Sequence, residues 1–262
     1  MTLLILPNST TVQNPCRIAY DNLLERGAVA ASSEDPSYPV ANAYDGLTCD
    51  FFRPTATGTV TITLTLPMGG TANYFAFYNQ DLFKSGGSIG LQYYDGTAWQ
   101  NATPGVTPSN NAPRIVFFNP VTATQWRVLI TCSQQFNLGV VSFGQYLALP
   151  YGMYLGWTPP RLGRATKLTT SMSDAGAFLG RRIIGNGIRT ALQLQYASDA
   201  WMDANWLGFV RHAEQKPWFF APQVVKRPND VAFCWTEDEI PPPTHTHYGF
   251  MGTTINLRVV VE

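Results

Sequence analysis

The chain has 262 residues, enough for one large domain or two ordinary ones with buried cores. Its 17 basic residues balance 17 acidic ones, and charged residues make up only 13%. Neutrality removes any global electrostatic pull toward nucleic acid or anionic membrane, and no stretch of the sequence has the apolar length needed to cross a bilayer. Few charges and 13% aromatic residues suit a protein that buries surface against partners.

The first 25 residues are expected to form an N-terminal arm. The apolar start, residues 1–7, is too short for a secretory signal, so we expect synthesis in a cytoplasm. The four cysteines lack the paired spacing of zinc sites and are expected to be reduced and mostly buried: Cys16, Cys49, Cys132 and Cys234. We expect no cofactor.

Strand signals dominate up to residue 150. Residues 59–66 alternate threonine with an apolar residue, the pattern of a strand with one buried face. Asp95-Gly96 is a hairpin signal, and residues 104–113 form a long polar loop. Further short strands are expected over 72–78, 88–94, 115–118, 126–131, 139–141 and 143–149. Short strands separated by turn residues predict an antiparallel β-sandwich.

Several motifs in this region carry a resemblance. Ala31-Ser32-Ser33 is followed by Tyr38-Pro39 and then by Ala43-x-Asp45-Gly46. Trp99 follows the Asp95-Gly96 turn, and residues 125–130 read as a closing strand. This order resembles discoidin or coagulation-factor C-type domains, which are galactose-binding-like jelly rolls. The resemblance covers roughly residues 26–150 and implies a sandwich that binds or scaffolds; the tryptophan usual near residues 51–53 is absent here.

A second ordered set of motifs follows residue 143. Residues 143–150 lead into Ser173-x-x-Gly176-x-x-x-Gly180-Arg181-Arg182, an aromatic helix and residues 216–220. This order resembles tail structural proteins of tailed bacteriophages, over about 110 residues. The resemblance implies a virion tail protein of the distal tail, tail tip or baseplate, with other tail proteins and further copies of itself as partners.

Residues 151–262 are predicted to form a second, β-rich assembly domain with one prominent helix near residues 199–214. Ser198 or Asp199 can cap that helix by accepting a backbone hydrogen bond. One helical face, expected to pack into the domain core, carries Met202, Trp206, Phe209, Val210 and Ala213. Residues 255–261 read as a C-terminal strand. The fold class is therefore all-β: a jelly-roll sandwich followed by this domain.

Catalytic and metal signals are sparse. The sequence has no H-E-x-x-H, no G-x-S-x-G and no P-loop, so we expect no enzyme activity. His245 and His247 could share one side of a strand and bind a metal, but an exposed loop is the simpler interpretation. Asp45 and Asp50 could line a calcium loop, but turn-forming Asp-Gly chemistry explains them as well. We predict no bound metal.

One segment is strongly basic. Between residues 161 and 189 a single acid, Asp174, faces six cations: Arg161, Arg164, Lys167, Arg181, Arg182 and Arg189. Arginine suits ion pairs at interfaces. In an assembly these side chains could pair with the acids Glu237, Asp238 and Glu239 of a neighbouring subunit. Pairing within the chain, or a solvated basic face, is the alternative, and overall neutrality disfavours DNA contact.

Two functions follow. The first is a homo-oligomeric structural subunit of a phage tail, with a weak carbohydrate-binding-like module. The alternative is a carbohydrate-binding protein that recognises host-surface glycans, with Tyr93, Tyr94 and Trp99 as the candidate platform unless they pack into the core. A hydrolase would need a carboxylate pair or a nucleophile in a cleft, and the sequence presents neither.

Overall fold

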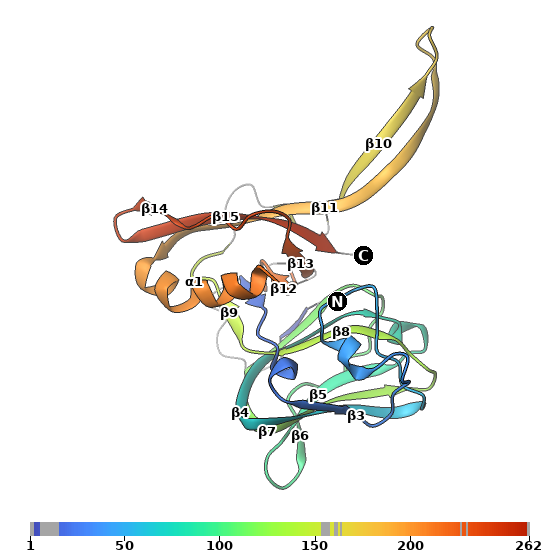
Figure 1. Ribbon diagram of the computed structural model, residues 1–262, viewed down its shortest axis with the longest axis vertical. Helices are drawn as coiled ribbons and strands as arrows, with labels where there is room; N and C mark the ends of the chain where they lie inside the picture. The colour runs from blue at the N-terminus through green and yellow to red at the C-terminus, as the bar shows by residue number, and fades with distance from the viewer. Residues whose placement is uncertain are drawn as a thin grey trace.

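The computed structural model describes residues 3–5, 16–152, 158–159, 162, 164–225, 227–228 and 230–260. Strands form two sheets, and one α-helix covers part of the second sheet (Figure 1). The expected all-β fold class is confirmed. Short 3-10 helices lie at Leu23–Arg26, Val40–Ala43 and Leu82–Lys84.

The first, seven-stranded sheet folds on itself into a sandwich. Its strands are β1 (Leu3–Ile5), β3 (Ala28–Ala31), β4 (Gly58–Gln80), β5 (Ser88–Tyr94), β6 (Trp99–Asn101), β7 (Arg114–Cys132) and β8 (Leu138–Gly144). The long strands β4 and β7 pair antiparallel, and their register shifts between Thr65 and Gly70. Before the shift β4 pairs with β3, and after it with β8. Two layers result, β3-β4-β7-β5-β6 below and β8-β4-β7-β1 above.

The predicted alternation sets the core between these layers. Val60, Ile62 and Leu64 are buried, whereas the intervening threonines face outward. From the upper layer Phe75, Phe77, Val116, Val141 and Phe143 join the same cluster. Each large apolar side chain buried in this way contributes roughly 1.5–3 kcal/mol relative to exposure.

The second sheet has eight strands in the order β10-β11-β15-β13-β12-β2-β9, with β14 added along β15. Their bounds are β2 Arg17–Ala19, β9 Tyr146–Ala148, β10 Arg164–Met172, β11 Phe178–Ser198, β12 Trp218–Ala221, β13 Ala232–Thr236, β14 Thr244–His247 and β15 Phe250–Val260. Strands β2 and β9 come from segments before residue 26 and before residue 150, yet they hydrogen-bond into this sheet. The division of the chain at residues 25 and 150 stays a prediction.

The helix α1 (Asp199–Ala213) packs on this second sheet. Ser198 caps it, because its hydroxyl accepts a hydrogen bond from the Trp201 N–H at 3.3 Å. Met202, Trp206 and Phe209 are buried, as their helical spacing predicts. They pack in one cluster with Leu192, Leu194, Ile255 and Leu257 from β11 and β15.

The two units share a third core cluster. The outer face of the upper sandwich layer supplies Tyr74, Ile115 and Phe117, and the second unit supplies Phe219 and Phe233. The Phe219 and Phe233 ring centroids lie 4.9 Å apart. Because this cluster is apolar and fully buried, it holds the two units together as one body.

Removing a ring from this shared cluster should destabilise the whole chain. We expect Phe233→Ala to lower the free energy of unfolding by about 3–5 kcal/mol through lost burial and a residual cavity, and the chain to unfold in one transition. Chemical denaturation followed by fluorescence and circular dichroism measures both. The control is Met68→Ala, since Met68 is 80% exposed. Two transitions, only one of them shifted by Phe233→Ala, would contradict a shared core.

Candidate functional site

A two-stranded ribbon, called here the arm (residues 164–188), projects from the second sheet. β10 pairs with the first half of β11, from Arg164 opposite Ile188 to Met172 opposite Phe178, and the second half of β11 pairs with β15 in the body. Figure 1 shows the arm extending away from the rest of the molecule. Every side chain of β10 is exposed.

One face of the arm is apolar. Leu168 lies opposite Ile183, and Met172 lies opposite Phe178. Cross-strand partners share a face, and the register shifts insert their extra residues in β11, so Leu168 and Met172 stay on one side. These four side chains are 43–64% exposed. Solvent therefore meets these four large apolar side chains on one face of a ribbon too thin to have a core, and the extra β11 residues Leu179 and Ile184 are exposed as well.

The cations of the arm lie on both of its faces. Between the two apolar pairs, the Arg181 Nε donates to the Thr170 Oγ1 at 3.3 Å, and the guanidinium lies 6.0 Å from the Phe178 ring centroid. Arg182 lies opposite Thr169, next to Lys167 along the ribbon. Arg164, Lys167, Arg181 and Arg182 make no ion pair within the described part of the chain.

The remaining candidates of the predicted basic and acidic set do not lie with the arm cations. Arg189 pairs with Glu237 of the same chain, Nη2 to Oε1 at 2.5 Å, and Arg258 Nε lies 3.3 Å from the same oxygen. Arg189 therefore has an acidic partner within the chain, which is the alternative that the sequence left open, and this ion pair lies at the base of the arm. A role for Arg189 at a subunit contact stays a prediction. Asp238 and Glu239 are exposed after β13; Arg161 lies outside the described residues.

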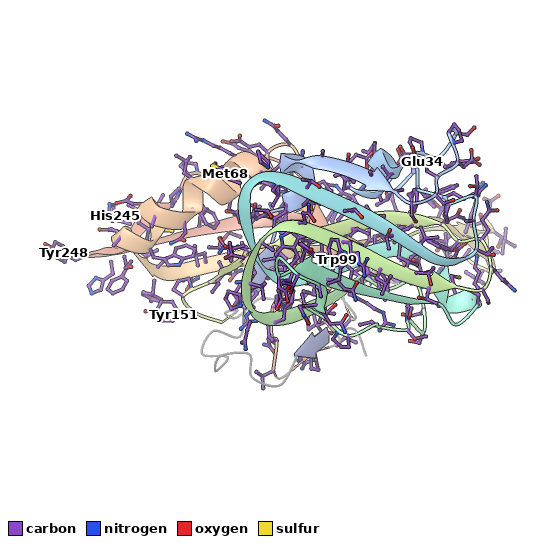
Figure 2. All side chains as sticks on the ribbon, turned by 90° about the horizontal axis from the view of Figure 1, so that it is seen from below. Glu34, Met68, Trp99, Tyr151, His245 and Tyr248 are labelled. Atoms are coloured by element: carbon purple, nitrogen blue, oxygen red, sulfur yellow. The ribbon has the colours of Figure 1, made fainter. Side chains whose placement is uncertain are left out.

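A second surface, called here the Trp99 face, lies on the outer side of the lower sandwich layer (Figure 2). It consists of Gln92, Tyr94, Trp99, Asn101 and Arg127. The Arg127 guanidinium lies 4.3 Å from the Trp99 ring centroid. Arg127 Nε donates to Gln92 Oε1 at 2.6 Å, and Gln92 Nε2 donates to Asn101 Oδ1 at 2.7 Å. The hydrogen bonds hold the guanidinium and both amides in place.

Of the three glycan-binding candidates, the structure brings two together. The Tyr94 and Trp99 ring centroids are 5.5 Å apart. Tyr93 points the other way and packs against Trp126 at 5.9 Å, beside the sandwich core. The alternation of β5 explains this split. Sequence reasoning missed Arg127 and Gln92, because only the register of β5 with β6 and β7 places them beside Trp99.

The weak metal candidates form no ligand cluster. Among the described residues no group of three His, Cys, Asp or Glu side chains could hold a metal ion. His245 Nδ1 lies 3.8 Å from Asp199 Oδ1, and His247 is exposed on β14. Calcium prefers six to eight oxygen ligands, and we assign no ion to Asp45 and Asp50.

Asp45 and Asp50 nevertheless interact. Burial raises the pKa of the Asp45 carboxyl, and the neighbouring Asp50 raises it further, against a hydrogen bond from the Leu47 N–H. The Asp50 Oδ1 atom is buried and has no hydrogen-bond partner among the described residues. The two carboxyl groups therefore interact unfavourably within this loop when both are ionised.

A cavity of about 350 Å³ lies between the two units. The 46–48 loop lines it from the sandwich, and residues 213–217 with Phe233, Trp235 and Thr236 line it from the second unit. Its only ionisable lining groups among the described residues are Glu214 and Lys216, and the Lys216 Nζ contacts Glu25 at 2.5 Å. The lining presents no nucleophile beside a base.

No helix within the described residues is long and apolar enough to cross a membrane. No protein-family model matches the sequence, and no curated protein matches it.

Solved structures match part of the chain. A pectin-binding carbohydrate-binding module is 22% identical, covering 47% of this chain and 94% of its own, with a TM-score of 0.39. The family 32 module of Clostridium perfringens NanJ, in complex with galactose, is 16% identical, covering 50% and 99%, at 0.40. A chitosan-binding module from a Paenibacillus chitosanase/glucanase is 21% identical, covering 48% and 99%, also at 0.40. The likeness extends over about half of this chain. The fold of that half is defined by the strand pairings described above.

Replacing Asp50 with a neutral residue should remove its contribution to the raised pKa of Asp45. A carboxyl whose pKa is raised by folding contributes stability below its unfolded pKa, near 4, and loses it as the pH rises through the folded value. We expect Asp50→Asn to lower the pKa of Asp45. The free energy of unfolding of the variant minus that of the wild type should therefore be higher at pH 7 than at pH 3. NMR titration and thermal melts at both pH values measure this, with Asp238→Asn, at an exposed position after β13, as the control. An unchanged Asp45 titration would refute the coupling.

Proposed function

We propose that this chain is a non-enzymatic structural protein that assembles with neighbouring proteins through the arm. The observation that supports this most strongly is the exposed apolar face formed by Leu168, Met172, Phe178 and Ile183. Soluble monomers rarely present such a surface without using it.

The physics of a two-stranded ribbon supports the proposal. A lone hairpin is marginally stable in water, because it has no core and few ordered contacts to offset its conformational entropy. β10 is also an edge strand of its sheet, so its outer N–H and C=O groups can pair with another chain. A protein partner that covers the apolar face and the edge stabilises the arm.

At a finer level, we propose a tail protein of a tailed bacteriophage, in the distal tail, tail tip or baseplate region. The order of motifs after residue 143 supports it, and so does the division of the molecule. The arm lies at one end of the long axis and β6, with the Trp99 face, lies at the other (Figure 1). One end can therefore assemble while the other stays accessible. Mass spectrometry of purified virions of the encoding phage tests this proposal. Absence of this chain from the virions would exclude the tail role.

Replacing apolar arm residues should prevent assembly without unfolding the protein. Phe178→Asn combined with Ile183→Asn removes two side chains whose burial is worth roughly 1.5–3 kcal/mol each, so association should weaken about 100-fold or more. The fraction of chain recovered in particles or complexes measures this, and circular dichroism should not change.

The matched control is Thr169→Asn, on the opposite face of the same ribbon. It should assemble normally. If the double variant assembled as well as the control, the apolar face of the arm would not be an assembly surface.

The Trp99 face favours a second candidate function, saccharide binding. A partly exposed indole offers a flat surface to a sugar ring, and amide and guanidinium groups held by hydrogen bonds can orient its hydroxyls. Trp99, Gln92 and Arg127 combine these elements on a sheet face that the strands keep rigid. The contacts are few and solvent-accessible, which indicates weak binding.

Trp99→Ala should abolish any saccharide binding. Glycan-array screening followed by calorimetry measures affinity for neutral and acidic oligosaccharides. The control is Thr59→Ala, an outward-facing residue of β4 away from Trp99. Affinity that survives Trp99→Ala would place the sugar elsewhere, and a wild-type chain that binds no glycan would exclude this second candidate.

A further inference from the structure

We propose that the partner of the arm is a second copy of this chain, and that the arm docks on the opposite end of that copy's second unit. That end, called here the β14 end, consists of Tyr196, Asp199, Asp203, His245 and Tyr248. The inference rests on the proposed assembly function and names the partner for the same arm.

Charge balance points to a copy of the same chain. The arm holds four of the 17 basic residues and one of the 17 acidic residues, a net charge of +3. The rest of the chain keeps 13 basic and 16 acidic residues, a net charge of −3. The body of a second copy therefore carries the charge that complements the arm, and complementary charge selects partner and register.

The same charges disfavour contact between two arms. Pairing β10 of one copy with β10 of another would join two ribbons that each carry a net charge of +3. Like charges in juxtaposition cost binding energy. Contact between the arm of one copy and the body of another is thus preferred. Such a contact joins two different surfaces.

The β14 end offers acids beside exposed aromatic rings. Tyr248, on the β14–β15 turn, is 95% exposed. Tyr196, on the adjoining part of β11, is 46% exposed. Asp199 joins this turn, since its N–H donates to the Gly249 carbonyl at 3.3 Å. Asp203 follows one turn later on α1 and is exposed. Figure 2 shows Tyr248 and His245 together at one end of the molecule.

The acids of this end are not neutralised by cations of their own chain. Asp203 has no ion pair among the described residues, and the one ion-pair partner of Asp199 there is the imidazole of His245, at 3.8 Å, which is charged only when protonated. Tyrosine and arginine are among the residue types enriched at interfaces. Arg181 lies on the apolar face and can therefore pair with Asp199 or Asp203 while Phe178 and Met172 pack against the tyrosines. Arg182, on the opposite face, adds to the positive charge that the arm brings to this contact.

The positions of the two surfaces set the type of assembly. The arm lies at one end of β11 and the β14 end at the other, next to Ser198. A contact between two different surfaces of identical chains is head-to-tail, so it closes into a ring or grows as a filament. Each copy then contributes one arm and receives another.

Charge-swap complementation of the full chain tests this. Wild type should self-associate, whereas Arg181→Glu/Arg182→Glu and Asp199→Lys/Asp203→Lys should each raise the dissociation constant at least about tenfold. An equimolar mixture of the two variants should restore association. The acidic arm of the first variant then meets the basic β14 end of the second, and the unchanged arm of the second meets the unchanged β14 end of the first. Light scattering and analytical ultracentrifugation measure the masses.

The outcomes separate this inference from the proposed function. Recovery in the mixture supports it and also shows that both variants are folded. A wild type that stays monomeric, swaps without effect, or a mixture that fails to recover overturns it. If wild type is monomeric but Phe178→Asn/Ile183→Asn still abolishes incorporation into particles, the assembly function stands with a different partner. If that variant is incorporated normally, the assembly function itself fails.

Discussion

The apolar cluster between the two units is the constraint on which the rest of the structure depends. Tyr74 and Phe117 from the sandwich pack against Phe219 and Phe233 from the second unit. The Tyr74 hydroxyl also donates to the Asp21 carbonyl at 2.8 Å, which ties the segment after β2 to the sandwich. Because neither unit can leave this contact without exposing aromatic surface, the arm and the Trp99 face are held apart on one body.

The arm is exposed but firmly attached. β11 runs without interruption from the body into the arm, and the Arg189–Glu237–Arg258 ion pairs lie at the base. A strand that begins in a packed sheet carries its direction outward. The apolar face is therefore presented in a defined orientation, which lowers the entropy lost on docking.

The two candidate surfaces differ in the way their side chains are held. On the Trp99 face, hydrogen bonds between Arg127, Gln92 and Asn101 fix polar groups around an aromatic ring. On the arm, Leu168, Met172, Phe178 and Ile183 contact water and lack such partners. The first arrangement suits a small polar ligand, and the second suits a protein surface that excludes water.

The sequence by itself determined the local elements. The alternation of residues 59–66 fixed which side of that strand is buried, and the spacing of Met202, Trp206 and Phe209 fixed the buried face of α1, because period and burial are linked within one element. Only the tertiary structure decided which elements pair. It placed β2 and β9 in the second sheet, set Arg127 over Trp99, paired Arg189 with Glu237, and left the apolar face of the arm in solvent. These outcomes depend on strand register and on contacts between residues far apart in the chain, for which local periodicity carries no signal.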